Sequence, residues 1–257
     1  MEIYIKKCIY RQNYDNPDVK DTGSWSQSVS LFYNSNMHDT PLEIGGTPIQ
    51  IGANASAQYA VRLSQDKHVA DTVLPFDKAT QSQAPDYLKY GATLKLGYNK
   101  TLLSIGELWL DLPVTTVDAS RQLLTSYWGA NLKSQLNNKL FAEIGRIEKV
   151  SPRNEEDFHR FSFTSKGVTG YSDGLNYIDL RYQFTPTLKG EYYFGNMEDL
   201  YNKHYVGVDH LWKNANFSVN SKFKYFNAKD NGNLFDIDAQ NVGLLETLKI
   251  KNHSFGV

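Results

Sequence analysis

Eight basic side chains recur at polar positions of alternating segments, and cations arranged in this way could guide anions. They are Arg62, Lys89, Lys95, Lys133, Arg181, Lys189, Lys222 and Lys224. Fixed positive charges along one wall raise the local concentration of anions. An arginine can in addition hold a carboxylate through two parallel N–H bonds. The alternative is that each residue only keeps a sheet face solvated, and for any single residue the two interpretations have equal weight.

Residues that could carry out covalent or metal chemistry are sparse in this chain. The six histidines, at positions 38, 68, 159, 204, 210 and 253, lack metal-ligand spacing. Cys8 is the single cysteine, so the chain can form neither an internal disulfide nor a metal site built on thiolates alone. The nucleophile-elbow and phosphate-loop motifs are absent. We therefore expect no enzyme activity, no bound metal and no cofactor.

The composition argues against nucleic-acid binding and against a helical membrane protein. A net charge of −1 gives no electrostatic reason for nucleic acid to bind. No run of about 18 apolar residues is present, which excludes a transmembrane helix. Aromatic residues reach 13%, and Tyr and Trp favour the membrane–water interface. This aromatic content fits the two girdles of a membrane barrel, but it also fits a tyrosine-rich soluble sheet.

The elements that position the basic residues are expected to be antiparallel strands, because polarity alternates with a period of two. Between residues 177 and 184, the even positions, from Ile178 to Phe184, are apolar, and the odd positions include Asp179 and Arg181. A strand with this pattern has one apolar and one polar face, as the strands of an outer-membrane barrel do. About twelve strands are predicted. They cover residues 3–10, 24–33, 49–61, 88–98, 101–110, 127–136, 139–147, 158–165, a hairpin at 176–195, 204–212, 216–226, and 244 to the end.

One segment breaks the alternation. Residues 111–127 are too long for a turn, and they are predicted to form a structured loop that contains Asp118 and Arg121. Elsewhere short turns such as Asn99–Lys100 alternate with longer loops. Barrels of the outer membrane show the same asymmetry, with tight turns at one end and long loops at the other.

Several stretches resemble the OprD family of outer-membrane porins, the outer-membrane carboxylate channels. Residues 108–114 and 118–124 are similar to the constriction-loop signature of that family, in which Pro-Val precedes an Arg-Leu-Leu motif. In this chain Gln122 follows the arginine, and Thr125 stands where the family usually has proline. The other similar stretches are 23–27, 150–154, 182–186, 192–193, 197–201, 204–205 and 253–255.

The resemblance implies a closed eighteen-stranded transmembrane β-barrel in the outer membrane of a Gram-negative bacterium. Residues 1–257 would form a single, partial barrel domain that supplies about the first twelve strands. The chain would then be a fragment, without a signal peptide and without the C-terminal strands. Its partners would be outer-membrane lipid, the barrel-assembly machinery and small carboxylate solutes, and no nucleic acid.

The resemblance also implies a role for the loop at 111–127, which would fold inward as a constriction. Its Arg121 would belong to a ladder of basic residues that contact the solute, with Asp118 orienting the guanidinium. Alternatively, Arg121 only fixes the loop to the wall by pairing with Asp118. The ladder would continue along the strands through Arg62, Lys89, Lys95, Lys133, Arg181 and Lys189.

Two functions remain open at this point. The first is passive, selective uptake of small molecules that bear a carboxylate, such as aromatic acids or amino acids. The second is that of a secreted, soluble β-sandwich that binds carbohydrate through exposed aromatic side chains. Periodicity alone does not separate them, because the apolar face would be a core in the sandwich and a lipid-facing surface in the barrel.

Overall fold

The computed structural model describes the chain except for residues 13–14, 16–21, 65–72, 78, 119 and 257. Every regular element within the described part is a β-strand, and no helix there is long and apolar enough to cross a membrane. The chain divides into two compact units. The first unit comprises residues 1–98, 104–129 and 149–159, and the second comprises 99–103, 130–148 and 160–257.

The first unit is built from long antiparallel strands and short hairpins. Strands β1 (Glu2–Gln12), β2 (Thr22–Asn34), β4 (Thr47–Arg62) and β7 (Asp86–Tyr98) are neighbours in that order. Strand β3 (His38–Ile44) pairs with β4, and β5 (Phe76–Asp77) pairs with β6 (Ser82–Gln83). Residues of β8 (Thr101–Leu108), β9 (Ser126–Gln135) and β10 (Leu140–Ser151) belong to both units.

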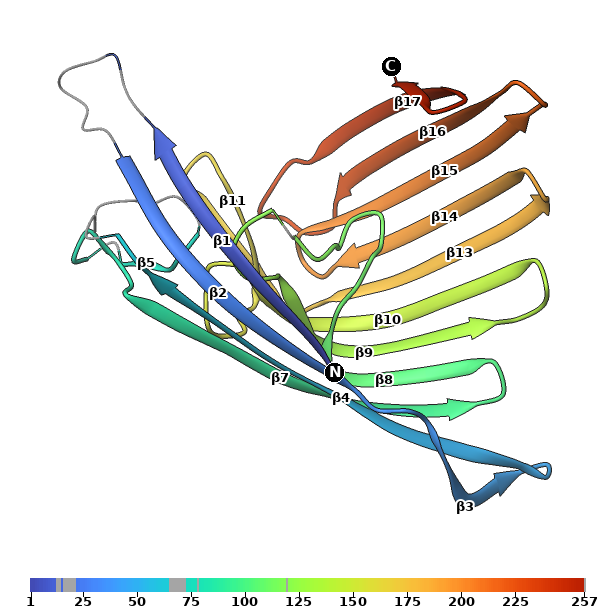
Figure 1. The fold of residues 1–257 in the computed structure, drawn as a ribbon, viewed down its shortest axis with the longest axis horizontal. Helices are drawn as coiled ribbons and strands as arrows, with labels where there is room; N and C mark the ends of the chain where they lie inside the picture. Colours follow the sequence, from blue (N-terminus) through green and yellow to red (C-terminus); the bar gives the residue numbers. More distant parts are fainter. Residues whose placement is uncertain (13–14, 16–21, 65–72, 78, 119, 257) are drawn as a thin grey trace. The chain divides into compact units, whose positions relative to one another are not determined.

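The second unit continues as a meander, in which each long strand pairs with the next along the chain (Figure 1). Its strands are β11 (Phe161–Ser165), β12 (Val168–Ser172), β13 (Leu175–Thr185), β14 (Leu188–Met197), β15 (Tyr201–Lys213), β16 (Phe217–Asp230), β17 (Asp238–Ile250) and β18 (His253–Gly256). Strands β11 and β12 form a separate hairpin. Tight turns join β13 to β14 and β17 to β18, and these turns set the cross-strand register.

Most long strands match the predicted segments to within a few residues. The strands that the alternation did not reveal are the short ones: β3, β5, β6, β12 and β18. The break in alternation also matches, because β8 ends at Leu108 and β9 begins at Ser126, which leaves a loop at 109–125.

The distribution of buried and exposed side chains is the reverse of that in a water-soluble sheet. In the first unit Ser28 and Gln58 are buried, whereas Leu31 and Tyr59 on the opposite faces of the same strands are exposed. In the second unit Asp179 is 0% exposed and Phe184 on the same strand is 53% exposed. A soluble sandwich would bury its apolar face as a core. The sandwich alternative is therefore wrong, and the alternation is that of a sheet whose apolar face meets lipid.

Candidate functional site

The loop at 109–125 lies against the polar faces of strands in the first unit. The Gln122 side chain donates to the backbone oxygen of Lys6 at 2.8 Å, and Ser28 Oγ donates to the backbone oxygen of Gln122 at 3.3 Å. The backbone N–H of Leu124 donates to Gln58 Oε1 at 3.2 Å. These bonds join the loop to β1, β2 and β4, so the chain's own loop covers part of the polar wall.

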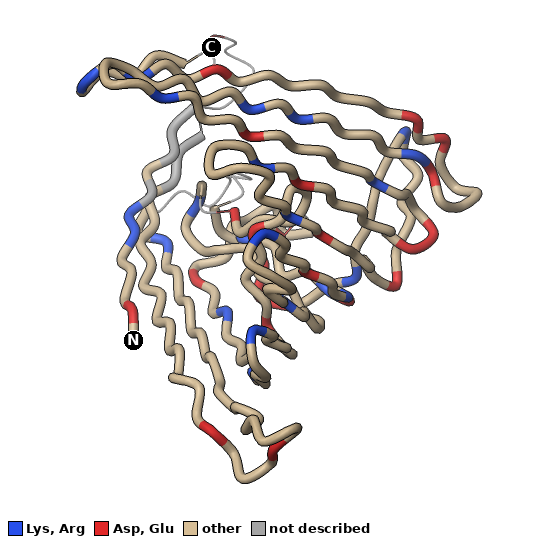
Figure 2. Tube along the Cα trace, turned by 90° about the vertical axis from the view of Figure 1, so that its right-hand side faces the viewer, with Lys and Arg blue, Asp and Glu red and all other residues tan. Residues whose placement is uncertain are grey.

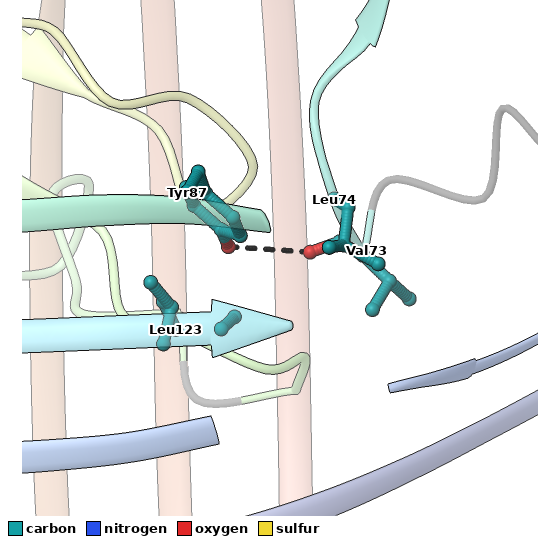
Figure 3. Close-up of a cluster of buried hydrophobic side chains, with 5 residues drawn as sticks. Val73, Leu74, Tyr87 and Leu123 are labelled. Atoms are coloured by element: carbon teal, nitrogen blue, oxygen red, sulfur yellow. Dashed lines mark hydrogen bonds between the residues drawn. The ribbon is translucent and has the colours of Figure 1, made fainter. Parts of the chain in front are cut away.

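A small apolar cluster fixes the same loop. Leu123 is fully buried with Ala60, Val73 and Leu74, and the cluster is completed by Tyr87 (Figure 3). The hydroxyl group of Tyr87 donates to the backbone oxygen of Val73 at 3.2 Å. Burial of apolar side chains stabilises by roughly 25 cal/mol per Å². The cluster therefore anchors the loop on a side of the sheet that is otherwise polar.

Lys89, expected in the basic ladder, is buried and bonded to backbone. It is 2% exposed, and its Nζ donates to the backbone oxygens of Leu124, Ser151 and Pro152 at 2.8, 2.9 and 2.7 Å. An ammonium group has three N–H donors, so none is left for a solute. In this structure Lys89 holds the loop and the end of β10 together.

Two further members of the expected ladder also bond to nearby chain segments. Lys95 is buried, and its Nζ donates to Asn34 Oδ1 at 2.5 Å and to the backbone oxygen of Ser35 at 2.9 Å. Arg62 donates to the backbone oxygen of Gln83 at 2.8 Å. Alternation correctly placed these cations on the polar face, but it could not show that they donate hydrogen bonds to backbone carbonyls.

Asp118 forms its ion pair with Arg153 rather than with Arg121. It also accepts hydrogen bonds from Ser120, at 2.9 Å from the backbone nitrogen and 2.5 Å from Oγ. The Ser120 hydrogen bonds, and then the charge of Arg153, lower the pKa of the Asp118 carboxyl. This corrects the expected pairing of Asp118 with Arg121. The only sequence signal for Arg153 was its place in the family-like stretch 150–154.

Arg121 keeps its charge free of an ion pair. One guanidinium nitrogen donates to the backbone oxygen of Ser120 at 3.2 Å. Within the described part of the chain, no carboxylate oxygen lies within 4.0 Å of the guanidinium. The side chain is half-buried, so a positive charge stands on the loop without a fixed counter-ion.

A second group of basic residues surrounds a half-open cavity of about 270 Å³ in the second unit. The cavity is lined by Arg181, Lys189, Lys222 and Lys224 together with Glu191 and Asp209. Two cross-strand rows bring them together: Lys189, Asp209 and Lys222 in one, and Arg181, Glu191, Gly207 and Lys224 in the other. Figure 2 shows blue and red positions spaced along the strands that lead to the C-terminus.

Arg181 is held by three carboxylates. Its Nε lies 2.7 Å from Asp179 Oδ2 and 3.2 Å from Glu191 Oε1, and one terminal nitrogen lies 3.7 Å from Glu143 Oε2. The guanidinium carbon also lies 5.1 Å from the centre of the Phe141 ring. These contacts fix the orientation of the guanidinium and neutralise its charge.

The remaining lysines differ in how far acids neutralise them. Lys133 lies 3.6 Å from Glu143, and Lys222 lies 3.7 Å from Asp209. Lys189 and Lys224 are exposed, and no described carboxylate lies within 4.0 Å of either ammonium group. The free positive charge of the cavity therefore rests on Lys189 and Lys224. The candidate list drawn from the sequence included Lys189 but placed no particular weight on Lys224.

Gly207 makes room at the floor of this cavity. A Cβ at this position would collide with the hydroxyl end of Tyr205. Tyr205 is itself buried, and both residues line the cavity. Across the described residues, no cluster of three or more His, Cys, Asp or Glu is arranged to hold a metal ion.

Comparison with known proteins gives one family. A model described as outer membrane porin, OprD family, matches residues 3–257. The porin-like protein GalP of Pseudomonas putida is 29% identical over 231 residues, which cover 86% of this chain and 54% of GalP. The chain thus spans about half the length of this curated relative.

Solved structures agree with the family match. The crystal structure of Acinetobacter baumannii OccAB4 is 75% identical, with a TM-score of 0.96 over 99% of this chain and 65% of that one. OccAB2 of the same organism is 26% identical, with a TM-score of 0.89 over 99% of this chain and 64% of its own. A structure of Pseudomonas aeruginosa OpdK with vanillate, 24% identical, covers 92% of this chain and 60% of its own with a TM-score of 0.82. At that identity OpdK supports the fold alone.

Proposed function

This chain belongs to the OprD family of outer membrane porins. We propose that it forms the wall and the constriction of a channel for the passive uptake of small carboxylates. The protein lies in the outer membrane of a Gram-negative bacterium. The proposal concerns the solute, which would be an aromatic acid or an amino acid. Its other partners would be outer-membrane lipid and the barrel-assembly machinery.

The observation that carries the proposal is the pair of uncompensated lysines at the cavity in the second unit. Lys189 and Lys224 present ammonium groups without nearby carboxylates, so an anion would meet positive charge that no internal acid has neutralised. A mobile carboxylate can replace the missing counter-ion. Because the cavity is half open, the solute would stay partly hydrated, and binding would be weak enough to allow release.

Arg181 supports this site in a different way from the lysines. Its contacts with Asp179 and Glu191 leave it oriented but nearly neutral. It would therefore direct a carboxylate by geometry more than by net charge, since the planar guanidinium has five donors and the acids occupy only some of them. Arg121 would supply a third free cation, on the loop at 109–125 that we assign as the constriction.

Vanillate is an aromatic carboxylate, and its presence in the OpdK structure is consistent with this class of solute. No enzymatic step is proposed, since the relatives are porins and the cavity residues have no partners arranged for nucleophilic or acid–base chemistry. The polar wall and the loop would act only by charge, size and transient hydrogen bonding.

The test uses the full-length protein in planar bilayers. The double variant Lys189→Gln/Lys224→Gln is compared with Lys229→Gln, which removes an exposed lysine of β16 outside the cavity. The double variant is expected to lower permeability for benzoate relative to potassium, and the control is expected to leave the ratio unchanged. An unchanged ratio in the double variant, or the same change in both, would reject the proposed site.

A further inference from the structure

The strand ladder of the first unit is interrupted beside β7. Strand β8 ends one residue after Glu107, and a Cβ at Gly91 of β7 would collide with the Glu107 side chain. Residues 86–90 of β7 therefore run on past the end of β8. At Leu88 the backbone N–H donates to Glu156 Oε1 at 3.0 Å, so a side chain of the segment after β10 takes the place of a neighbouring strand.

A half-open cavity of about 630 Å³ occupies this interruption. Its lining comes from both faces of the wall. Leu88, Tyr90 and Trp128 are exposed on the apolar face, whereas Ser56 is buried on the polar face. Phe158 also lines the cavity, and its ring centre lies 5.9 Å from that of Trp128 in an edge-to-face contact. The cavity thus enters the wall from the lipid-facing side and has an aromatic lining.

The cross-strand rows of the first unit show the depth of this cavity. The row that contains Leu88 is apolar and exposed throughout, and it consists of Ile5, Val29, Tyr59 and Leu88. The next outward row towards the long loops is mostly polar, and it consists of Lys7, Gln27, Val61 and Asp86. The cavity therefore opens inside the apolar band, next to the edge where the long loops begin.

The cavity also carries negative charge. Asp157 and Glu156 both line it, and Asp157 is exposed. Among the described residues, no cationic group lies within 4.0 Å of either carboxylate. Hydrocarbon supplies neither a counter-ion nor a hydrogen-bond donor. A ligand at this depth is therefore favoured if it brings a positive charge, and an anion is repelled.

Aromatic rings beside a free carboxylate are the chemistry that binds organic ammonium ions, because ring faces attract a cation and the carboxylate supplies the counter-charge. The volume lies within the range of small-molecule sites, about 300–1,000 Å³. We propose that this cavity binds amphipathic organic cations from the outer part of the membrane. The ammonium group lies beside Asp157, and an attached ring or short alkyl chain packs against Tyr90 and Trp128. The site uses none of the residues assigned to the carboxylate solute.

Binding of an aromatic ammonium ion to the full-length protein tests the site. Fluorine-labelled benzyltrimethylammonium is titrated into lipid nanodiscs that contain the protein, and into empty nanodiscs, and binding is followed by fluorine NMR. Saturable binding is expected only with the protein. An excess of benzoate should not displace the cation, because the carboxylates of the cavity repel it. Absence of saturable binding, or displacement by benzoate, would overturn the proposal.

Variants locate the binding in the cavity. Asp157→Asn and Trp128→Leu should each raise the Kd about tenfold, since one removes the counter-charge and the other an aromatic face. Trp128→Phe keeps a ring and should bind more tightly than Trp128→Leu. Glu43→Gln, at an exposed acid of β3 outside the cavity, is the matched control and should bind as the wild type does. Wild-type affinity in Asp157→Asn or Trp128→Leu, equal affinity of the two Trp128 variants, or the same loss in Glu43→Gln would overturn the proposal.

Discussion

Arg153 forms the ion pair with Asp118, and the two residues are 35 positions apart in the chain. The pair joins the loop at 109–125 to the segment that follows β10. Ser120 strengthens the contact, since its hydroxyl group accepts from Arg153 at 2.8 Å and donates to Asp118 at 2.5 Å. Arg153 thus fixes the loop, and Arg121, which has no ion pair, is the arginine that we propose contacts the solute.

Replacing Arg121 is expected to change selectivity without releasing the loop. Arg121→Ala in the full-length protein removes a charge that has no fixed counter-ion, so carboxylate flux should fall while cation flux is retained. Conductance in bilayers with benzoate and with a cationic permeant measures the two fluxes. An equal change in both would mean that the loop has moved, and no change would remove Arg121 from the pathway.

Replacing Arg153 is expected to release the loop without a specific effect on anions. Arg153→Gln breaks the contact with Asp118, so the loop should loosen and the conductance should change for anions and cations alike. Proteolysis of the folded protein at the loop should also become faster. Arg160→Gln, which breaks the exposed pair with Asp173, serves as the control and should alter neither measurement. Anion-specific loss in Arg153→Gln would contradict the assignment.

The Asp118 contact should also respond to acid. The pKa of Asp118 is lower in the folded protein than its ordinary value, mainly because of the Ser120 hydrogen bonds. The stabilisation is therefore complete above the ordinary pKa of an aspartate and is lost as the pH falls through the lowered one. Loop proteolysis of the wild type should increase over that acidic interval. In the Asp118→Asn variant the loop should already be cleaved faster at neutral pH. If the pH profile of loop proteolysis is the same in the wild type and in this variant, the prediction is refuted.

Lys89 is expected to matter for stability and not for selectivity. Lys89→Met leaves three backbone acceptors without their donor, which should lower the free energy of unfolding by about 3 kcal/mol. Denaturant unfolding of the full-length protein in detergent measures the loss. Lys189→Met, which removes an exposed ammonium group, should have little effect on unfolding. Similar losses in the two variants would show that Lys89 does not hold the loop.

The two faces of β13 can be distinguished by arginine substitution. Leu180→Arg places a charge on the lipid side and should cost about 2–4 kcal/mol if the site is near the midplane. Gln183→Arg, on the polar face, should be tolerated. Refolding yield and unfolding midpoint in lipid vesicles provide the measurement. Equal tolerance at the two positions would mean that the faces are assigned in the wrong direction.

Alternation predicted the faces of the long strands because it depends only on neighbouring residues. It placed Asp179 and Arg181 together on one side of β13, and the structure agrees. Strand β3 was missed because its sequence, HDTPLEI, contains a proline and does not alternate. Short strands such as β12 offer too few residues for any period to be recognised.

The contacts of the site join residues that lie far apart in the sequence, and no local pattern encodes which of them will meet. Nothing near Asp118 indicates that Arg153 will reach it, and nothing near Lys89 indicates that carbonyls at 124, 151 and 152 will surround it. The cavity in the second unit likewise depends on turn lengths, because a shift of one residue in β14 or β16 would separate Lys189 from Lys222. Side-chain polarity was predictable, but partners were not.

The hydrogen bonds of Lys89 also bear on the order in which parts of the chain fold. The three backbone oxygens that accept hydrogen bonds from its ammonium group lie 35, 62 and 63 residues later in the chain. Contacts between residues so distant in sequence form slowly, because the intervening chain must first lose its freedom. Two of the three acceptors lie at or just after the end of β10, so the hydrogen bonds of Lys89 are expected to be completed only after β10 has formed, late in folding.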